Sequence, residues 1–126
     1  MRIAIAAKSV YEFYLARHLK RAKLVNAPST HAAFELFVTE KLDALVGLRP
    51  RLVADSEMMP GSRIVHGRFM LVKQSIASPR GRDAGAKYIR GFIEDVKVSG
   101  FIARALETNG VRGVTIAPKA AVNQRR

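Results

Sequence analysis

Short apolar runs alternate with stretches of helical periodicity along the first part of the chain. Residues 3–7, 24–27 and 44–46 are short apolar runs of the kind that form buried strands. Between these runs, apolar side chains recur at helical spacing over residues 11–19 and 33–38. A strand, helix, strand, helix, strand order implies two βαβ units. The pattern therefore predicts an α/β fold with a small parallel sheet flanked by helices.

Capping residues mark where the helices of this first part begin. Ser9 precedes the first helical stretch and has Glu12 three residues later, the pattern of a capping box. Ser29 or Thr30 is placed to cap the second helix. Pro50 suits the first turn of a short third helix that would end near residue 58.

The second part of the chain predicts strands followed by helices. Residues 64–77 are rich in β-branched and large apolar side chains and predict one or two strands. A long helix should follow with Asp83 as its cap, and Ser99-Gly100 should kink or break that helix. Asn109-Gly110 is a helix stop signal, and residues 113–118 could add an edge strand.

Composition narrows the classes of function. The 126 residues include no cysteine, which excludes disulfides and thiolate chemistry. Residues 1–8 contain only five consecutive apolar residues, so we expect no signal peptide in the chain as given. The formal net charge of +12 suits a polyanionic partner, but the basic residues are spread out, and only residues 17–23 and 124–126 form clusters. A nucleic-acid-binding domain is therefore the alternative interpretation and the less favoured one.

The sequence contains no complete catalytic or metal-binding motif. His18, His31 and His66 are far apart, and no two have the spacing of metal ligands. The chain contains no glycine-rich phosphate loop followed by a helix, and no serine in a nucleophile elbow. We therefore expect a binding protein that is not an enzyme and needs neither a metal nor a cofactor.

Residues that follow the three predicted strands define a candidate ligand site. In an open parallel sheet, ligands bind beyond the carboxyl ends of the strands, where helices begin. Ser9 and Val10 follow the first strand, Ser29 and Thr30 the second, and Arg49 the third. Backbone N–H groups, hydroxyls and a guanidinium suit a carboxylate or a similar anion. The alternative is that Ser9 and Thr30 serve only as helix caps.

Several stretches resemble the family 3 extracellular solute-binding proteins, which are periplasmic receptors for amino acids and related polar solutes. Residues 2–12, with Ser9-Val10-Tyr11-Glu12, resemble the strand and helix start that open the second lobe of that family. Residues 32–47, with Asp43-Ala44, resemble a later helix and strand of the same lobe. Residues 74–82 resemble the return from the hinge, and the closing residues 99–105 and 110–118 are similar to those of one branch of the family.

This resemblance implies a half of the type II periplasmic-binding-protein-like fold with a C-terminal helical segment. The predicted domains are an α/β lobe at 1–78, return helices at 79–118 and a disordered tail at 119–126. The implied function is solute binding for an ABC transporter, with a membrane permease as partner and a periplasmic location.

Two departures from the family modify what the resemblance implies. The first lobe of the family is missing, so the chain would be a truncated product, an isolated half or a stand-alone descendant. Amino-acid receptors place an acid where this chain has Leu48 and Arg49, so an organic acid or another anion is expected more than an amino acid. Without a first lobe, the apolar face of the return helix should be covered in a homodimer. Its residues are Tyr88, Phe92, Ile93 and Val96.

Overall fold

The computed structural model describes residues 1–120 and divides the chain into two units. The first unit is Met1–Met70, and the second begins at Leu71. The boundary predicted from the sequence was residue 78.

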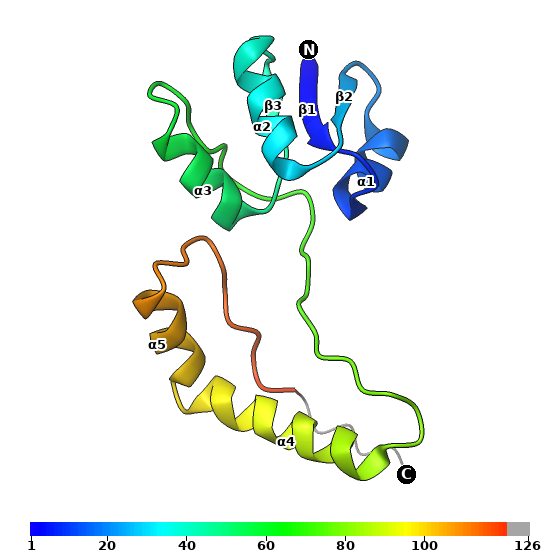
Figure 1. The fold of residues 1–126 in the computed structure, drawn as a ribbon, viewed down its shortest axis with the longest axis vertical. Coiled ribbons are helices and arrows are strands. Elements are labelled where there is room, and N and C mark those ends of the chain that lie inside the picture. The colour runs from blue at the N-terminus through cyan, green and yellow to red at the C-terminus, as the bar shows by residue number, and fades with distance from the viewer. Residues whose placement is uncertain (121–126) are drawn as a thin grey trace. The chain divides into compact units, whose positions relative to one another are not determined.

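The first unit is built around a small parallel sheet of three strands, which confirms the α/β class and the first three predicted strands (Figure 1). The strands are β1 (Arg2–Ala6), β2 (Lys23–Ala27) and β3 (Ala44–Leu45), and their order in the sheet is β2-β1-β3. Ala6 pairs with Ala27 of β2, and Ile3 pairs with Ala44 of β3. Both edges of β1 are therefore hydrogen-bonded, and the carboxyl ends of all three strands lie along one edge of the sheet.

Three helices follow the strands of the first unit at the predicted places: α1 (Val10–His18), α2 (Thr30–Thr39) and α3 (Arg49–Glu57). Ser9 caps α1, and its Oγ accepts a hydrogen bond from the backbone N–H of Glu12 at 3.2 Å. Ser29, rather than Thr30, caps α2 and accepts a bond from the N–H of Ala32 at 3.1 Å. The helix α3 has a proline in its first turn, as expected.

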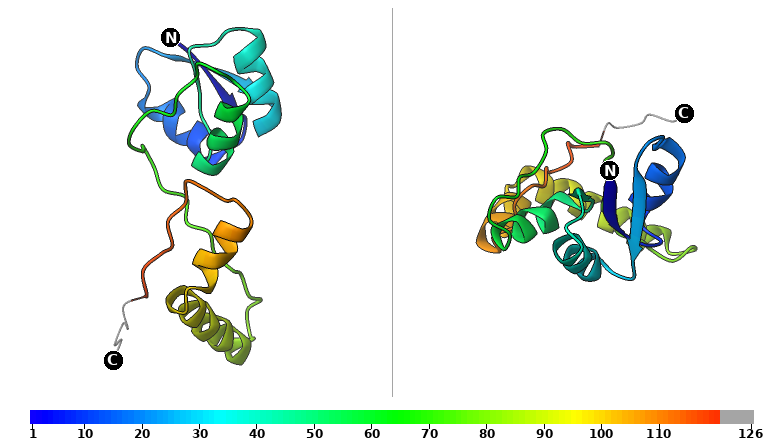
Figure 2. Two further views of the ribbon diagram at one scale, coloured as in Figure 1. Left: turned by 90° about the vertical axis from the view of Figure 1, so that its left-hand side faces the viewer. Right: turned by 90° about the horizontal axis from the view of Figure 1, so that it is seen from above.

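The core of the first unit forms on the two faces of β1. Ile5 is fully buried and packs with Tyr11 and Leu15 of α1. Because side chains alternate along a strand, Ala4 points to the opposite face, and it is also fully buried. The helix α2 contacts all three strands and buries Ala33, and small side chains on both sides let helix and sheet approach closely. Figure 2 shows α1 and α2 on either side of the sheet.

The strands predicted over residues 64–77 are not formed, since the structure has no helix or strand there. Side-chain composition favours a strand only where a neighbouring strand accepts the backbone hydrogen bonds. Residues 69 and 70 of this segment are held by side-chain packing and not by strand hydrogen bonds. Phe69 stacks on Tyr14 of α1 with ring centroids 5.7 Å apart, and Met70 packs against the Ile5 cluster.

The second unit contains two helices among its described residues, α4 (Asp83–Val98) and α5 (Phe101–Thr108). The predicted break at Ser99-Gly100 is confirmed, because Gly100 has φ +77° and ends the first helix in a left-handed turn. The predicted cap of α4 was wrong. Arg82 is the capping residue and makes no side-chain capping bond, whereas Asp83 lies in the first turn, where its charge complements the helix dipole.

The segment after α5 is irregular up to Ala120, so the predicted edge strand at 113–118 was also wrong. Side chains of α4 bind this segment in place of a strand partner. The carboxylate of Glu94 accepts a hydrogen bond from the N–H of Ala120 at 2.8 Å, and Lys97 Nζ donates to the carbonyl of Pro118 at 3.4 Å. Most of the tail predicted to be disordered, residues 121–126, lies outside the described residues.

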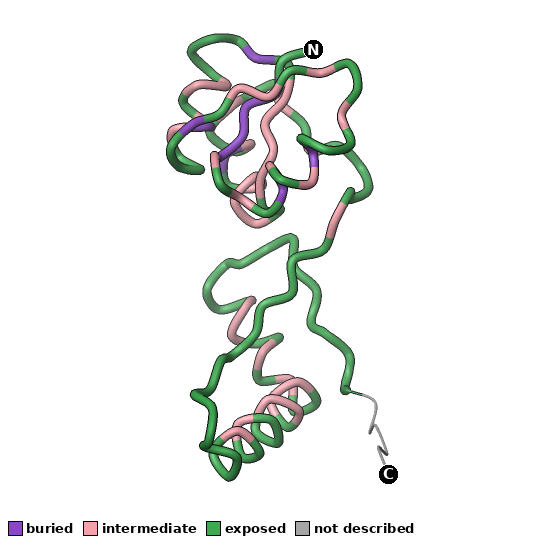
Figure 3. Tube along the Cα trace, turned by 90° about the vertical axis from the view of Figure 1, so that its right-hand side faces the viewer, coloured by how far each residue is buried: buried purple, intermediate pink, exposed green. Residues whose placement is uncertain are grey.

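The two units differ sharply in burial (Figure 3). Within residues 1–120, all the buried residues belong to the first unit, and no residue between 71 and 120 is buried. The apolar side chains of α4 and α5 are at best half-buried. The first unit therefore has a core of its own, whereas the described part of the second unit has none.

Shortening Ile5 should strongly destabilise the first unit. Ile5→Ala removes three carbons from the most tightly enclosed site, and we expect a loss of about 3 kcal/mol in the free energy of unfolding. The measurement is urea denaturation followed by circular dichroism. Val65 is 74% exposed, so Val65→Ala serves as the control and should change stability by less than about 0.5 kcal/mol. Equal effects of the two substitutions would contradict the assigned core.

Acid should release the C-terminal segment from α4. The hydrogen bond from the Lys97 amine, followed by that from the Ala120 N–H, lowers the pKa of Glu94 below its ordinary value. A lowered folded-state pKa stabilises the contact above the unfolded-state pKa, and this stabilisation is lost as the pH falls through the folded-state value.

The Ala120 amide proton should therefore shift in NMR spectra as the pH falls below the range in which an ordinary glutamate carboxyl titrates. In Glu94→Gln the carboxylate no longer titrates, and the acid shift of Ala120 should disappear. An Ala120 signal that titrates equally in both proteins would contradict the contact.

Candidate functional site

The candidate site residues all lie at the edge of the sheet formed by the carboxyl ends of the strands. Ser9 follows β1, Ser29 and Thr30 follow β2, and Arg49 follows β3. Since β1 is the central strand, Ser9 lies between the other two positions. Neighbouring strands are about 4.8 Å apart, so the ends of the two outer strands are separated by about 10 Å. The strand ends that these residues follow therefore lie within about the length of a small ligand of one another.

Ser9 acts as a structural cap. Its hydroxyl donates to the carbonyl of Ala6 at 2.7 Å and accepts from the N–H of Glu12, so its proton is already used. Val10 is the first residue of α1, and its side chain is 53% exposed. Of these two predicted contacts, Ser9 offers a ligand little hydrogen-bonding capacity and Val10 offers only its backbone and an apolar surface.

Glu12 places a negative charge at the centre of this edge. Its carboxylate accepts hydrogen bonds from the backbone N–H of Lys8 and from Asn26 Nδ2, the latter at 2.6 Å. In an ideal capping box the second bond would come from Ser9, so the box is displaced by one residue. Glu12 thereby joins the start of α1 to β2. The charge of Glu12 also compensates the positive end of α1, and an added anion is disfavoured at that point.

Sequence reasoning recognised Glu12 as a capping partner but missed its bond to Asn26. The available signal was the polar Asn26 inside the otherwise apolar run 24–27. Asn26 pairs in register with Ile5, and adjacent residues of parallel strands point to the same face. That face is the one α1 covers, so the exposed amide of Asn26 lies within reach of a polar side chain from the first turn of α1.

The beginning of α2 is more open to a ligand. Ser29, Thr30 and His31 are all exposed, and the first turn of α2 contains no acidic residue. The nearest acid on the helix, Glu35, is 3.4 Å from His31 Nε2 and lies one turn further along. The partial positive charge of this helix end is therefore not compensated within its first turn.

Arg49 adds a full positive charge beyond β3. It is the first residue of α3 and is exposed, and its Nη2 donates to the carbonyl of Gly67 at 2.9 Å. That bond orients the guanidinium and uses one of its five N–H donors. Leu48, the capping residue of α3, makes no side-chain capping bond, and the first turn of α3 holds no acid. This corner of the edge is thus positively charged.

A buried carboxylate elsewhere on α3 has a structural explanation. Asp55 is only 3% exposed, and its Oδ1 lies 2.9 Å from Nε of Arg51, one helical turn earlier. The two atoms are in ion-pair contact, although they are not aligned as a hydrogen bond. A buried carboxylate needs such a countercharge, so Arg51 neutralises Asp55 and the pair requires no ligand.

Within residues 1–120, no three histidine, cysteine or acidic side chains are grouped closely enough to hold a metal ion. In the same part of the chain no helix combines the length and the apolar character needed to cross a bilayer. At the edge itself, the carboxylate of Glu12 is central, and the start of α2 and Arg49 flank it.

These features define the chain as an α/β protein with a small open parallel sheet and a polar edge at the carboxyl ends of its strands. Comparison with protein-family models, with curated proteins and with solved structures finds no match to this chain.

Proposed function

We propose that the first unit is the second lobe of a solute-binding protein and that its edge binds a small polar or anionic solute. The observation that carries the proposal is the placement of the start of α2 and of Arg49 on either side of β1, at the carboxyl ends of parallel strands. The sheet order and flanking helices are compatible with half of a type II periplasmic-binding-protein-like fold. Service to an ABC transporter permease and a periplasmic location follow from the same resemblance.

The charges at the edge favour particular contacts. Glu12 opposes an anion at the start of α1, so we assign the anionic group of the solute to Ser29, Thr30 and Arg49. A carboxylate that accepts from both a guanidinium and backbone N–H groups gains charge-assisted hydrogen bonds. The ligand class that suits this arrangement is an organic acid with a second polar group.

Organic acids should stabilise the first unit against heating, and Arg49 should be needed for that effect. With a solute at about 100 times its Kd, binding adds about 2.7 kcal/mol to the free energy of unfolding. Arg49→Ala should weaken binding at least about tenfold because it removes a charge-assisted contact worth roughly 1.5 kcal/mol or more. The measurement is the melting temperature across a panel of mono- and dicarboxylates.

A matched control is Arg63→Ala, which removes the same charge from an exposed position in the irregular segment after α3. This variant should keep the ligand-induced rise in melting temperature. If no carboxylate, amino acid or inorganic anion changes the melting temperature, solute binding by this chain is refuted.

The second candidate function is nucleic-acid binding, and a distinct basic cluster favours it. Arg17, Lys20, Arg21 and Lys23 are all exposed around the turn that joins α1 to β2. This turn leads into the amino end of β2, whereas Arg49 follows the carboxyl end of β3. Because the strands are parallel, the basic cluster and Arg49 lie at opposite ends of the strands. The two candidate functions therefore use separate surfaces and can be tested separately.

If the basic cluster binds nucleic acid, affinity for a random DNA duplex should fall steeply with salt. Each phosphate neutralised contributes about 0.9 to the slope of log K against log salt concentration. Replacing Lys20 and Arg21 together by glutamine should lower this slope by about 2 in fluorescence anisotropy titrations. Arg49→Ala should leave the slope unchanged. The absence of binding to the duplex at low salt would eliminate this candidate.

A further inference from the structure

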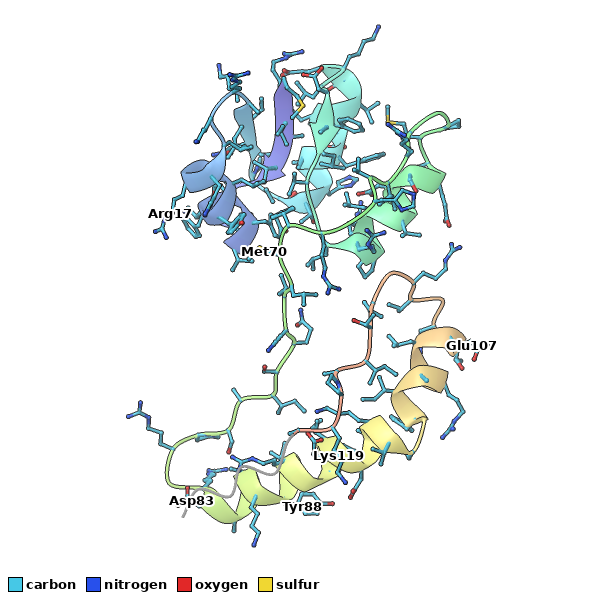
Figure 4. The ribbon with its side chains drawn as sticks, turned by 180° about the vertical axis from the view of Figure 1, so that it is seen from behind. Arg17, Met70, Asp83, Tyr88, Glu107 and Lys119 are labelled. Atoms are coloured by element: carbon cyan, nitrogen blue, oxygen red, sulfur yellow. The ribbon has the colours of Figure 1, made fainter. Side chains whose placement is uncertain are left out.

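The helix α4 has two apolar faces that differ in exposure. Ile89, Ile93 and Val96 form a half-buried stripe, and α4 contacts α5 and, through Glu94 and Lys97, the residues Pro118 and Ala120. Tyr88 and Phe92 lie on another side and are 75% and 50% exposed. Figure 4 shows Tyr88 projecting from α4 away from Lys119. The Tyr88 and Phe92 face is therefore not covered by any described part of its own unit.

A shallow groove runs along this exposed face. Its lining residues are Ala84, Lys87, Tyr88, Gly91, Phe92 and Asp95. Gly91 is one of these lining residues, and a Cβ placed there would meet no atom within 4 Å. A glycine in the interior of a helix costs about 1 kcal/mol relative to alanine, so it favours a site where another backbone approaches closely.

The charges of the groove are arranged symmetrically about Gly91. Lys87 precedes Gly91 by four residues, and Asp95 follows it by four, so each lies about 6 Å along the helix axis from the glycine. If a second α4 crosses antiparallel at Gly91, Lys87 of each copy faces Asp95 of the other. Ala84 then faces Val98, whose side chain is 64% exposed. The pairing is isologous, as a two-fold axis requires.

We propose that the α4 groove binds the α4 helix of a second copy of this chain, antiparallel and centred on Gly91. The groove carries one lysine and one aspartate, so the local charge does not oppose self-association even though the whole chain has a net charge of +12. Pairing covers the Tyr88 and Phe92 face and adds buried apolar surface to a unit in which none of the described residues is fully enclosed. The partner is thus identified by the complementarity of the groove with itself.

Charge reversal tests both the pairing and its register. Sedimentation equilibrium should give the unmodified chain a mass twice its 13.9 kDa at about 100 µM. Lys87→Asp places two aspartates in each cross-pair, and Asp95→Lys places two lysines there. Each variant alone should raise the dissociation constant at least about tenfold.

Mixing the two variants in equal amounts restores both opposite-charge pairs, so a heterodimer should form with an affinity close to that of the unmodified chain. Recovery on mixing shows that neither variant had merely lost its fold. Arg90→Asp makes the same charge change as Lys87→Asp at an exposed position outside the groove, and it should leave dimerisation within about threefold of normal.

Three results would overturn the proposal. The first is a monomer at all concentrations, which would assign the groove to another occupant such as a further segment of a longer chain. The second is a mixture of the two variants that remains monomeric, since the antiparallel register would then be wrong. The third is an equal loss of dimer in Arg90→Asp, which would indicate a general charge effect.

Discussion

The first unit depends on the enclosure of a single strand. Hydrogen bonds to β2 and β3 occupy both edges of β1, and its faces carry the most deeply buried side chains of the described residues, Ala4 and Ile5. Ile5 anchors α1 through Tyr11 and Leu15, whereas small side chains on the other face admit α2 at close range. The positions of all three helix starts follow from this arrangement, because each helix begins where a strand of the same sheet ends.

The same constraint determines the chemistry of the candidate edge. With β1 in the centre, the start of α1 lies between the other two helix starts, and Glu12 brings a carboxylate to that central position. Positive character is left at the flanks, at the open end of α2 and at Arg49. The charges therefore disfavour an anion at the middle of this edge and favour one at its two sides.

The second unit forms its helices without a buried core among its described residues. Its helices are ordered and α4 is held to the C-terminal segment by Glu94 and Lys97, yet none of its described residues is buried. Apolar helix faces in water are costly unless something covers them. The two apolar faces of α4 differ in what covers them. Ile89, Ile93 and Val96 are half-buried within the chain, and we propose that the Tyr88 and Phe92 face pairs with a second copy of itself.

Local information in the sequence determined the elements of this protein. Apolar runs, capping serines and the Ser99-Gly100 break predicted the strands and helices because these features act over one or two helical turns. The parallel sheet followed from the order of those elements. The candidate residues after each strand were predictable for the same reason, since their position depends only on where a strand ends.

Tertiary structure decided what depends on a partner distant in the sequence. Residues 64–77 have strand-like composition but no neighbouring strand, so Phe69 stacks on Tyr14 instead. Glu12 was predicted to bond within its own helix start, but packing added Asn26 from β2. Which of the apolar residues of α4 remain exposed was likewise set by contacts with α5 and the segment after it. Local propensity decides whether a segment forms a helix or a strand. Contacts between distant parts of the chain decide which backbone groups find hydrogen-bond partners and which side chains become buried.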